Sequence, residues 1–192
     1  MSRISVSRET HERLNIYVDC LLQWNRTVNL ISAGDAGDVW SRHIADGVAV
    51  GEMLSAHPGL IADLGSGAGI PGLVAAIVSN RPVCLVEADQ RKCAFLLEAG
   101  RRTGAPVTVK TSRIESAGLS KQAVVTARAL APLDRLLALS IPILSPAGVG
   151  LFIKGVSAEA EVEAARRQFQ FEAEIVRGSG TIIVIRGLKA LP

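Results

Sequence analysis

The stretch Asp63-Leu64-Gly65-Ser66-Gly67-Ala68-Gly69-Ile70-Pro71-Gly72 follows a short apolar run and precedes an apolar segment with helical spacing. Glycines between a strand and a helix let the backbone approach a ligand closely, and the helix start presents unpaired N–H groups. Glu87 ends the next apolar run, 22 residues after Gly65, where an acid accepts hydrogen bonds from ribose hydroxyls. The stretch therefore predicts a nucleoside-containing ligand at the carboxyl edge of two neighbouring strands.

Two cofactors fit this glycine loop. The string Gly67-x-Gly69-x-x-Gly72 matches the dinucleotide fingerprint, so NAD remains a candidate. Asp63 favours S-adenosylmethionine, because a carboxylate at the strand end repels a pyrophosphate but attracts an ammonium and a sulfonium. The chain also lacks room for a separate catalytic domain. We expect Asp63, Gly65, Gly67, Gly69 and Glu87 to hold S-adenosylmethionine; a sheet whose glycines only make turns remains a third interpretation.

Outward from the loop, short apolar runs alternate with segments of helical spacing. The predicted strands are 60–64, 83–86, 107–110, 123–127 and 149–153, and the predicted helices between and after them are 73–78, 90–100, 133–139 and 157–168. This alternation predicts a mostly parallel α/β sheet. Residues 169–176 and 181–185 flank a four-residue Gly-containing loop, which predicts a closing antiparallel hairpin.

The first third of the chain has a helical pattern. Apolar side chains recur at three- and four-residue steps from Glu9 to Val28, and a second helical stretch is predicted from Asp35 to Leu54. We expect these helices to form an N-terminal extension, residues 1–58, on a sheet formed by residues 59–192. The length of 192 residues suits a single domain.

Composition excludes several classes of protein. The chain is 48% hydrophobic with a net charge of +3, so it is not a disordered protein. Three cysteines are too few for a disulfide scaffold and indicate reduced thiols in a cytoplasm, and no apolar signal follows Met1. Residues 136–153 hold no charge, but their prolines and glycines favour a helix end, a turn and a buried strand over a membrane span.

Charge is concentrated in the middle of the chain. Residues 81–128 hold nine basic and four acidic side chains. A basic block of this kind serves either a polyanionic partner or a solvated Lys/Arg face, and the sequence leaves both interpretations open.

Six motifs occur in one order along the chain, and together they are specific. They are Leu22-Gln23-Trp24-Asn25-Arg26-Thr27-Val28-Asn29-Leu30, Arg42-His43-Ile44-Ala45-Asp46, the glycine loop, Arg113-Ile114-Glu115, Ala127-Arg128-Ala129 and Lys154-Gly155. On these motifs the chain resembles the RsmG (GidB) family of bacterial 16S rRNA guanosine-N7 methyltransferases. One position departs from the family pattern: Gly47 stands where the family commonly has a serine after Asp46.

The resemblance implies a class I S-adenosylmethionine-dependent methyltransferase with a Rossmann-like sheet. It places cofactor contacts on Gly65, Ile70, Ile114, Glu115 and Arg128, and it matches Glu87 to the ribose-binding acid. The implied partner is 16S rRNA, at a decoding-region loop, in the small ribosomal subunit or an assembly intermediate. No DNA, membrane or metal is expected.

Four further residues are candidates for RNA contact: Arg42, His43, Arg113 and Lys154. Each also has a structural interpretation. Arg42 has the i,i+4 spacing for a surface ion pair with Asp46, and Lys154 is equally consistent with a solvated lysine at a strand end. Arg128 has a structural alternative as well, an ion pair with Glu87 or Asp63.

The chemistry of guanine N7 requires no catalytic proton-transfer residue, because N7 carries a free lone pair and no proton. The sequence offers no evident Ser/His/Asp set or metal-spaced Cys/His pair, so no catalytic residue is nominated. Two rival functions remain: an NAD-binding nucleotide-sensing module, and a small-molecule methyltransferase on the same fold.

Overall fold

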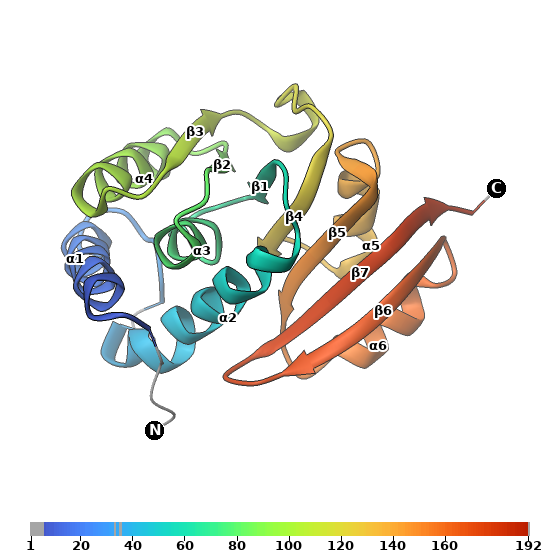
Figure 1. Cartoon of the computed structure of the whole chain (residues 1–192), viewed down its shortest axis with the longest axis horizontal. Coiled ribbons are helices and arrows are strands. Elements are labelled where there is room, and N and C mark those ends of the chain that lie inside the picture. The colour runs from blue at the N-terminus through green and yellow to red at the C-terminus, as the bar shows by residue number, and fades with distance from the viewer. Residues whose placement is uncertain (1–5, 33, 35, 192) are drawn as a thin grey trace.

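One sheet organises the chain in the computed structural model, which describes residues 6–191 except 33 and 35. Its strands are β1 (Ile61–Leu64), β2 (Val83–Glu87), β3 (Val107–Thr111), β4 (Gln122–Arg128), β5 (Leu144–Lys154), β6 (Phe169–Arg177) and β7 (Thr181–Ala190). They are ordered β3-β2-β1-β4-β5-β7-β6 (Figure 1). Strands β1 to β5 pair in parallel, and β7 pairs antiparallel with both β5 and β6. The predicted parallel sheet with a C-terminal hairpin is confirmed.

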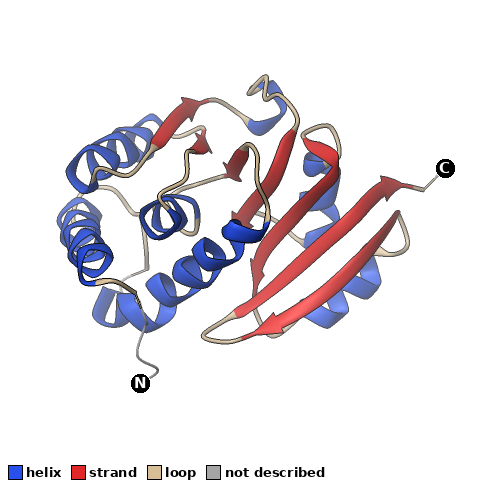
Figure 2. Cartoon of the chain, viewed as in Figure 1, coloured by secondary structure: helices blue, strands red, loops and turns tan. Residues whose placement is uncertain are grey.

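Helices cover both faces of this sheet (Figure 2). They are α1 (Arg8–Asn25), α2 (Ala45–Met53), α3 (Gly72–Ser79), α4 (Gln90–Thr103), α5 (Leu133–Ser140) and α6 (Ala158–Ala165). Helices α1 to α4 contribute to one hydrophobic cluster, and α5 and α6, which lie behind the sheet in Figure 1, contribute to the other. Strand residues alternate between the two clusters, as Val124 and Val125 of β4 show.

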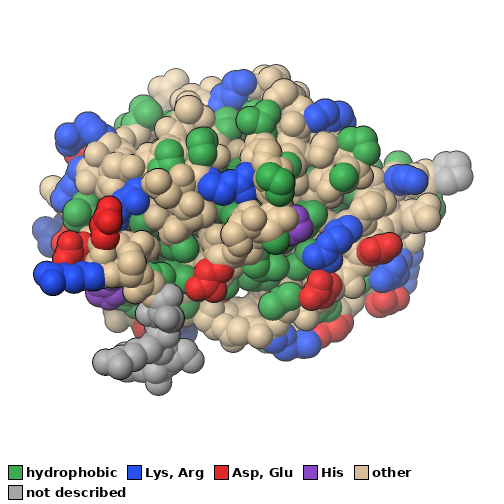
Figure 3. Space-filling model, viewed as in Figure 1, with side chains coloured by type: hydrophobic (Ala, Val, Ile, Leu, Met, Phe, Trp, Pro, Cys, Tyr) green, Lys and Arg blue, Asp and Glu red, His purple; other side chains and the backbone are tan. Residues whose placement is uncertain are grey.

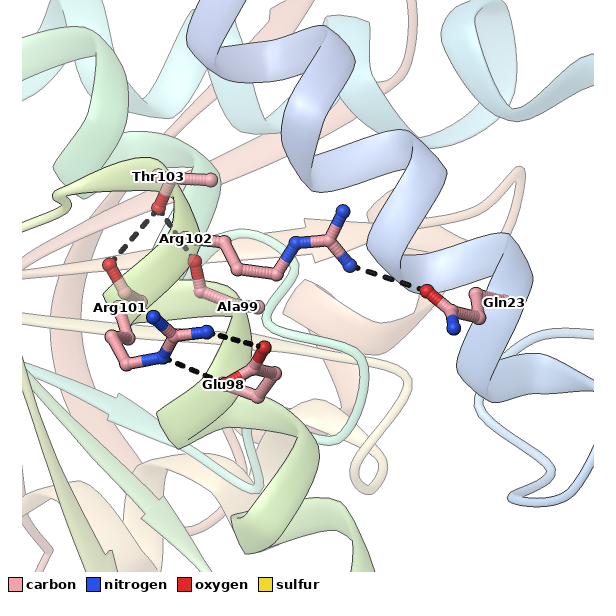
Figure 4. Close-up of polar contacts among 7 residues, drawn as sticks. Gln23, Glu98, Ala99, Arg101, Arg102 and Thr103 are labelled. Atoms are coloured by element: carbon pink, nitrogen blue, oxygen red, sulfur yellow. Dashed lines mark hydrogen bonds and ion pairs between the residues drawn. The ribbon is translucent and has the colours of Figure 1, made fainter.

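Helix α1 begins at a capped residue and buries an apolar stripe. The Ser7 hydroxyl accepts a hydrogen bond from the Thr10 N–H at 3.1 Å, which satisfies one unpaired donor of the first turn. The stripe includes Leu14 and Leu21, both fully buried in the same cluster as the sheet residues. Figure 4 shows Arg102 of α4 reaching across to Gln23 of α1, with 3.2 Å between the bonded atoms. The N-terminal helices therefore share a core with the sheet.

The helical stretch predicted from Asp35 to Leu54 is confirmed in the described residues, although it is not a uniform α-helix. Asp35 itself lies outside the described residues, and the rest divides into a 3₁₀ turn (Ala36–Asp38), a π-helical turn (Trp40–Ile44), α2 and a second 3₁₀ turn (Leu54–Ala56). π-helical turns of this kind often occur at functional sites.

Two glycines let α2 approach α3 closely. A Cβ on Gly47 would lie 2.6 Å from the Val74 side chain, and one on Gly51 would lie 2.8 Å from Val78. Both distances are below ordinary van der Waals contact, so side chains at these positions would push the helices apart. This packing explains Gly47, since the serine common in the family would have no room here unless Val74 moved.

The uncharged segment 136–153 has the structure predicted for it. Helix α5 ends at Ser140, a turn follows, and β5 begins at Leu144. Among the helices of the described residues, none is both long and apolar enough to cross a membrane. Several boundaries were predicted wrongly: β5 starts at Leu144 rather than at residue 149, β7 continues to Ala190, α4 continues to Thr103, and α6 ends at Ala165 rather than at residue 168.

Candidate functional site

A cavity of about 790 Å³ lies where β1, β2 and β4 end at the carboxyl edge of the sheet. This edge is where open α/β sheets bind ligands, and the volume is in the range of small-molecule sites. The structure brings together on its wall seven of the residues predicted to hold the cofactor: Gly65, Gly67, Ile70, Glu87, Ile114, Glu115 and Arg128. Asp63 and Gly69 do not line it.

The glycine loop has a backbone that side chains would disturb. Gly65, Gly67 and Gly69 have φ angles of +65°, +51° and +82°, which favour glycine over any residue with a Cβ. A Cβ on Gly65 would also lie 2.6 Å from a methyl carbon of Leu130. The loop therefore exposes backbone N–H and C=O groups to the cavity at close range.

Glu87 ties this loop to the end of β2. Its Oε2 accepts a hydrogen bond from the Gly67 N–H at 2.9 Å, and its Oε1 accepts from the N–H groups of Ala88 and Asp89 at 2.8 and 2.9 Å. Three backbone donors thus fix the carboxylate on the cavity wall. A carboxylate oxygen has about two lone-pair sites, so Glu87 keeps acceptor capacity for a ligand hydroxyl.

Tyr17 supports the loop from below and was missed by the sequence analysis. Its hydroxyl donates a hydrogen bond to the Ala68 carbonyl at 2.5 Å, although the two residues are 51 positions apart. Burial raises the pKa of this hydroxyl, so it remains a donor at neutral pH. The available signal was that Tyr17 is the one tyrosine of the chain and lies in an otherwise apolar helical stripe.

Asp63 lies beneath the loop rather than on the cavity wall. It is 1% exposed, and its Oδ1 accepts a hydrogen bond from the Thr126 hydroxyl of β4 at 2.6 Å. Burial raises the pKa of Asp63 to about 6, although the Thr126 and Ser66 hydroxyls and the Gly72 N–H oppose the rise. Oδ2 nevertheless receives no hydrogen bond of good geometry among the described residues. Asp63 is thus placed to brace β1 against β4.

Arg128 reaches from the end of β4 to the N-terminal helices. Its Nη2 donates to the Arg42 carbonyl at 3.0 Å, and its Nη1 lies 3.3 Å from Oδ2 of Asp46 in α2. The structural alternative considered from the sequence was an ion pair of Arg128 with Glu87 or Asp63. This alternative is wrong, because Arg128 pairs with Asp46 instead. The next residue, Ala129, has φ of +50°, a strained conformation for a residue other than glycine, and such strain is frequent at functional sites.

Asp46 joins Arg128 to the C-terminal hairpin. Its Oδ1 accepts a hydrogen bond from the Ser179 hydroxyl at 3.2 Å, across 133 residues of sequence. A Cβ on Gly180 would lie 2.9 Å from the carboxyl carbon of Asp46, so the hairpin leaves room for this carboxylate. Burial raises the pKa of Asp46, while Arg128, Ser179 and His43 act in the opposite direction.

Three of the four residues predicted to contact RNA lie at or near the cavity. His43 is 7% exposed and lines the cavity together with the exposed Arg113. Arg42 is exposed and contributes its carbonyl to Arg128.

Lys154 is not the solvated strand-end lysine considered from the sequence. Its side chain is 9% exposed, and its Nζ donates to the Ala131 carbonyl at 2.6 Å and pairs with Glu161 of α6 at 2.7 Å. Glu161 also accepts from the Leu133 N–H at 2.9 Å and the Ser157 hydroxyl at 3.0 Å. Burial raises the pKa of Glu161. The hydrogen bonds from Lys154, Ser157 and Leu133 outweigh burial, so the pKa is lowered overall. An RNA phosphate would have to compete with Glu161 for this ammonium.

A second cavity, of about 690 Å³, adjoins the first along residues 128–132. The rest of its wall is Asp46, Ile153, Lys154, Gly155 and Glu161. Two neighbouring cavities at one sheet edge provide space for two ligands that meet near Arg128.

Several arginines of the basic block of residues 81–128 are bound by other groups of the protein. Arg101 pairs with Glu98 at 2.8 Å, and Arg102 binds Gln23 (Figure 4). The Arg81 guanidinium donates to three backbone carbonyls, at 2.5 to 2.8 Å. On the face shown in Figure 3, Lys and Arg side chains are scattered rather than gathered into one patch. The structure therefore supports the solvated-face interpretation for part of this block.

The fold is shared with solved methyltransferases. A methyltransferase from Geobacter sulfurreducens matches with a TM-score of 0.64 and 14% identity, covering 88% of this chain and 87% of that one. The ribosomal protein L11 methylase of Lactobacillus delbrueckii matches with a TM-score of 0.61 and 20% identity, covering 73% and 76%. The fold is therefore that of the class I methyltransferases.

Sequence comparison narrows the class to one family. Residues 10–185 match the profile of GidB, described as rRNA small subunit methyltransferase G. The chain is 46% identical over 189 residues to the ribosomal RNA small subunit methyltransferase G of Gluconobacter oxydans, covering 96% of this chain and 97% of the relative. It is also 46% identical to the protein of that description from Paramagnetospirillum magneticum, covering 92% and 86%. The chain belongs to the GidB family.

Proposed function

We propose that this protein transfers a methyl group from S-adenosylmethionine to N7 of a guanosine in 16S rRNA of the small ribosomal subunit. The observation that carries the proposal is the cavity, in which the glycine loop, Glu87 and Arg128 meet at the carboxyl edge of a methyltransferase sheet. Membership of a family described as rRNA small subunit methyltransferases supports the substrate class.

The residues of the larger cavity fit S-adenosylmethionine. The open backbone of Gly65 and Gly67 allows the methionine part of the cofactor to approach closely, and Glu87 would accept hydrogen bonds from the ribose. Ile114 and Glu115 lie on the cavity wall after β3, where they would hold the adenine. Ile70 would pack beside it. Asp63 and Gly69 act from behind the wall, by holding the loop in place.

The reaction requires positioning rather than proton transfer. S-adenosylmethionine, when bound, supplies an electrophilic methyl group on its sulfonium. The residues on the wall then orient the nucleophile in line with that methyl group and exclude water. Since N7 has a free lone pair, a cation hydrogen-bonded to N7 would block the attack, so the cations here are expected to contact O6 or phosphate.

The target guanosine must be accessible to a cavity at the surface of the protein. In an A-form RNA helix, N7 faces a major groove too deep and narrow for side chains to reach. We therefore expect an unpaired or splayed-out guanosine, in the assembled subunit or an assembly intermediate. His43 and Arg113 line the cavity, Arg42 contacts its lining residue Arg128 through its carbonyl, and these three are the proposed RNA contacts. A cytoplasmic location follows from this substrate.

The test is methyl transfer from labelled S-adenosylmethionine to small subunits purified from cells that lack this protein. Digested RNA is scored for N7-methylguanosine, and the labelled nucleotide is mapped. Label in that nucleoside is the expected result. Label in another nucleoside would contradict the N7 assignment, and melting-temperature shifts with S-adenosylhomocysteine and NAD would show which cofactor the native state binds.

A further inference from the structure

The smaller cavity contains a buried carboxylate that the proposed methyl transfer does not use. Asp46 is 6% exposed and lies on the cavity wall, within 3.3 Å of Arg128, which lines both cavities. A buried charge is costly unless it is paired or binds a ligand. Arg128 partly neutralises Asp46 and keeps it as an acceptor of hydrogen bonds.

The contacts around Asp46 preserve a space for its carboxylate. The hairpin supplies the Ser179 hydroxyl and a glycine at position 180, where any side chain would overlap the carboxyl group. Helix α2 supplies Asp46 itself and is held tightly against α3 through Gly47. Three segments far apart in the sequence therefore converge to fix one carboxylate at this wall.

Guanine carries the hydrogen-bond donors that such a carboxylate accepts. Its N1–H and N2–H₂ groups lie side by side on the Watson–Crick edge, and an ionised carboxylate offers two acceptor oxygens at matching separation. The amino group lies on the far side of the purine from N7. A guanine held by these donors in the smaller cavity would therefore turn N7 away from Asp46 and leave it free for the methyl donor.

Glu161, the other carboxylate of this cavity, is less suited to the task. Its contacts are short, 2.7 Å to Lys154 and 2.9 Å to the Leu133 N–H, and the Ser157 hydroxyl occupies its second oxygen. The contacts of Asp46 to Ser179 and Arg128 are longer, at 3.2 and 3.3 Å. Longer contacts are weaker, so Asp46 can accept a ligand donor with less loss.

We propose that Asp46 selects guanine, by accepting hydrogen bonds from N1–H and N2–H₂ of the target base in the smaller cavity. This inference rests on the proposed function, because it names the residue that reads the substrate of the same site. Adenine also has an N7 atom, but its N1 is an acceptor and would face the carboxylate. Asp46 is thus a specificity-determining residue rather than a proton acceptor.

The test removes one functional group of the target base, its 2-amino group. Small subunits are assembled from 16S RNA ligated with either guanosine or inosine at the mapped position; inosine keeps N7, O6 and N1–H and lacks only the amino group. The wild-type protein should methylate the inosine RNA about 10- to 100-fold more slowly, which is the loss of one hydrogen bond to a charged group. Equal rates would overturn the proposal.

The variant Asp46→Asn separates base reading from structure. It should lower the rate on guanosine RNA and bring the guanosine-to-inosine ratio to within about 3-fold of one, since the lost partner no longer discriminates. A purely structural role would lower both rates equally and leave the ratio unchanged, which would contradict the proposal. If inosine merely disturbed the RNA, the ratio would likewise be unchanged.

Two controls complete the test. Glu161→Gln should keep the wild-type ratio of the rates on guanosine and inosine RNA. Loss of this ratio in Glu161→Gln alone would assign base reading to Glu161 instead. The affinity of Asp46→Asn for S-adenosylhomocysteine should stay within about 3-fold of wild type; a large loss with an unchanged ratio would mean that Asp46 acts through Arg128 on the cofactor. Asp46→Ser is the second variant if Asp46→Asn does not fold. No transfer to guanosine RNA by the wild type would instead contradict the proposed function itself.

Discussion

The two sides of the site are built differently. On the glycine-loop side, formed by residues 65–70 and Glu87, the contact that closes the loop joins Gly67 to a carboxylate 20 residues away. On the cationic side, formed by Arg128 and Lys154 with their partners, the contacts of Arg128 to the Arg42 carbonyl span 86 residues. The first side is a local motif, whereas the contacts of Arg128 exist only once the sheet and the N-terminal helices have assembled.

This difference affects how each side responds to change. The glycine-loop side depends on backbone conformation, so it is sensitive to added side chains and to the groups that brace it from below. The cationic side depends on ion pairs shielded from water, where removing one partner leaves the other charge uncompensated. We therefore expect substitutions on the cationic side to lower stability through the uncompensated partner charge, and those on the loop side to act through the groups that brace the loop.

The largest effect is expected from Lys154→Met, which keeps the side-chain length and removes the ammonium. It leaves Glu161, whose side chain is 23% exposed, without its cation, so the free energy of unfolding should fall by about 2–3 kcal/mol. Urea denaturation at neutral pH measures it. Lys121→Met is the matched control, since Lys121 is exposed and its Nζ is 3.4 Å from a carbonyl. Equal effects of the two substitutions would remove the proposed difference between the two sides.

The next effect concerns pH and the loop side. Burial raises the pKa of Asp63 to about 6, from 3.8, so the folded state binds this proton more tightly than the unfolded chain. Stability should therefore fall as the pH rises from about 4 to about 6, by about 2–3 kcal/mol, and remain lower above pH 6. Asp63→Asn should remove this fall and be more stable than wild type at pH 7.5.

Urea denaturation at pH 4 and pH 7.5 compares the wild type with Asp63→Asn. Asp19→Asn, at an exposed position of α1, is the control and should keep the wild-type dependence. Because Asp63 lies behind the cavity wall, S-adenosylhomocysteine affinity should change little. A large loss of affinity would show that the carboxylate itself serves the cofactor.

Arg128→Met tests whether the cationic side also binds the cofactor. Stability should fall by about 2 kcal/mol, less than for Lys154→Met, because Arg128 lies 3.3 Å from Asp46 whereas Lys154 lies 2.7 Å from Glu161. Affinity for S-adenosylhomocysteine, measured by calorimetry, should fall about 10-fold or more. Arg101→Met is the control, since Arg101 is in a surface pair with Glu98. Unchanged affinity would refute the cofactor contact of Arg128.

The smallest effect is expected from Tyr17→Phe, which removes only a hydroxyl. The Ala68 carbonyl loses its buried donor, so the free energy of unfolding should fall by about 1 kcal/mol. Affinity for S-adenosylhomocysteine should fall a few-fold, because the loop is less firmly held. Thermal denaturation and calorimetry measure the two effects. A stable variant with unchanged affinity would mean that α1 does not support the loop.

The sequence predicted the site best where its residues are close along the chain. The order of strands and helices followed from apolar periodicity, and the glycine loop followed from its position between a strand and a helix. The helical stretch predicted from Asp35 to Leu54 is present, but apolar periodicity did not reveal its 3₁₀ and π-helical turns. The close approach of α2 to α3 at Gly47 was equally invisible, since Val74 is the residue that excludes a side chain there.

What the sequence by itself determined is the sheet, the loop and the cofactor edge, because these depend on local preferences and on the positive φ angles that glycine permits. What only the tertiary structure decided is the set of long-range partners: Asp46 for Arg128 and Ala68 for Tyr17. A charged or polar group takes whichever complementary group folding brings within reach, so its partner depends on packing between distant segments. The carboxylate proposed to read the target base belongs to this second group.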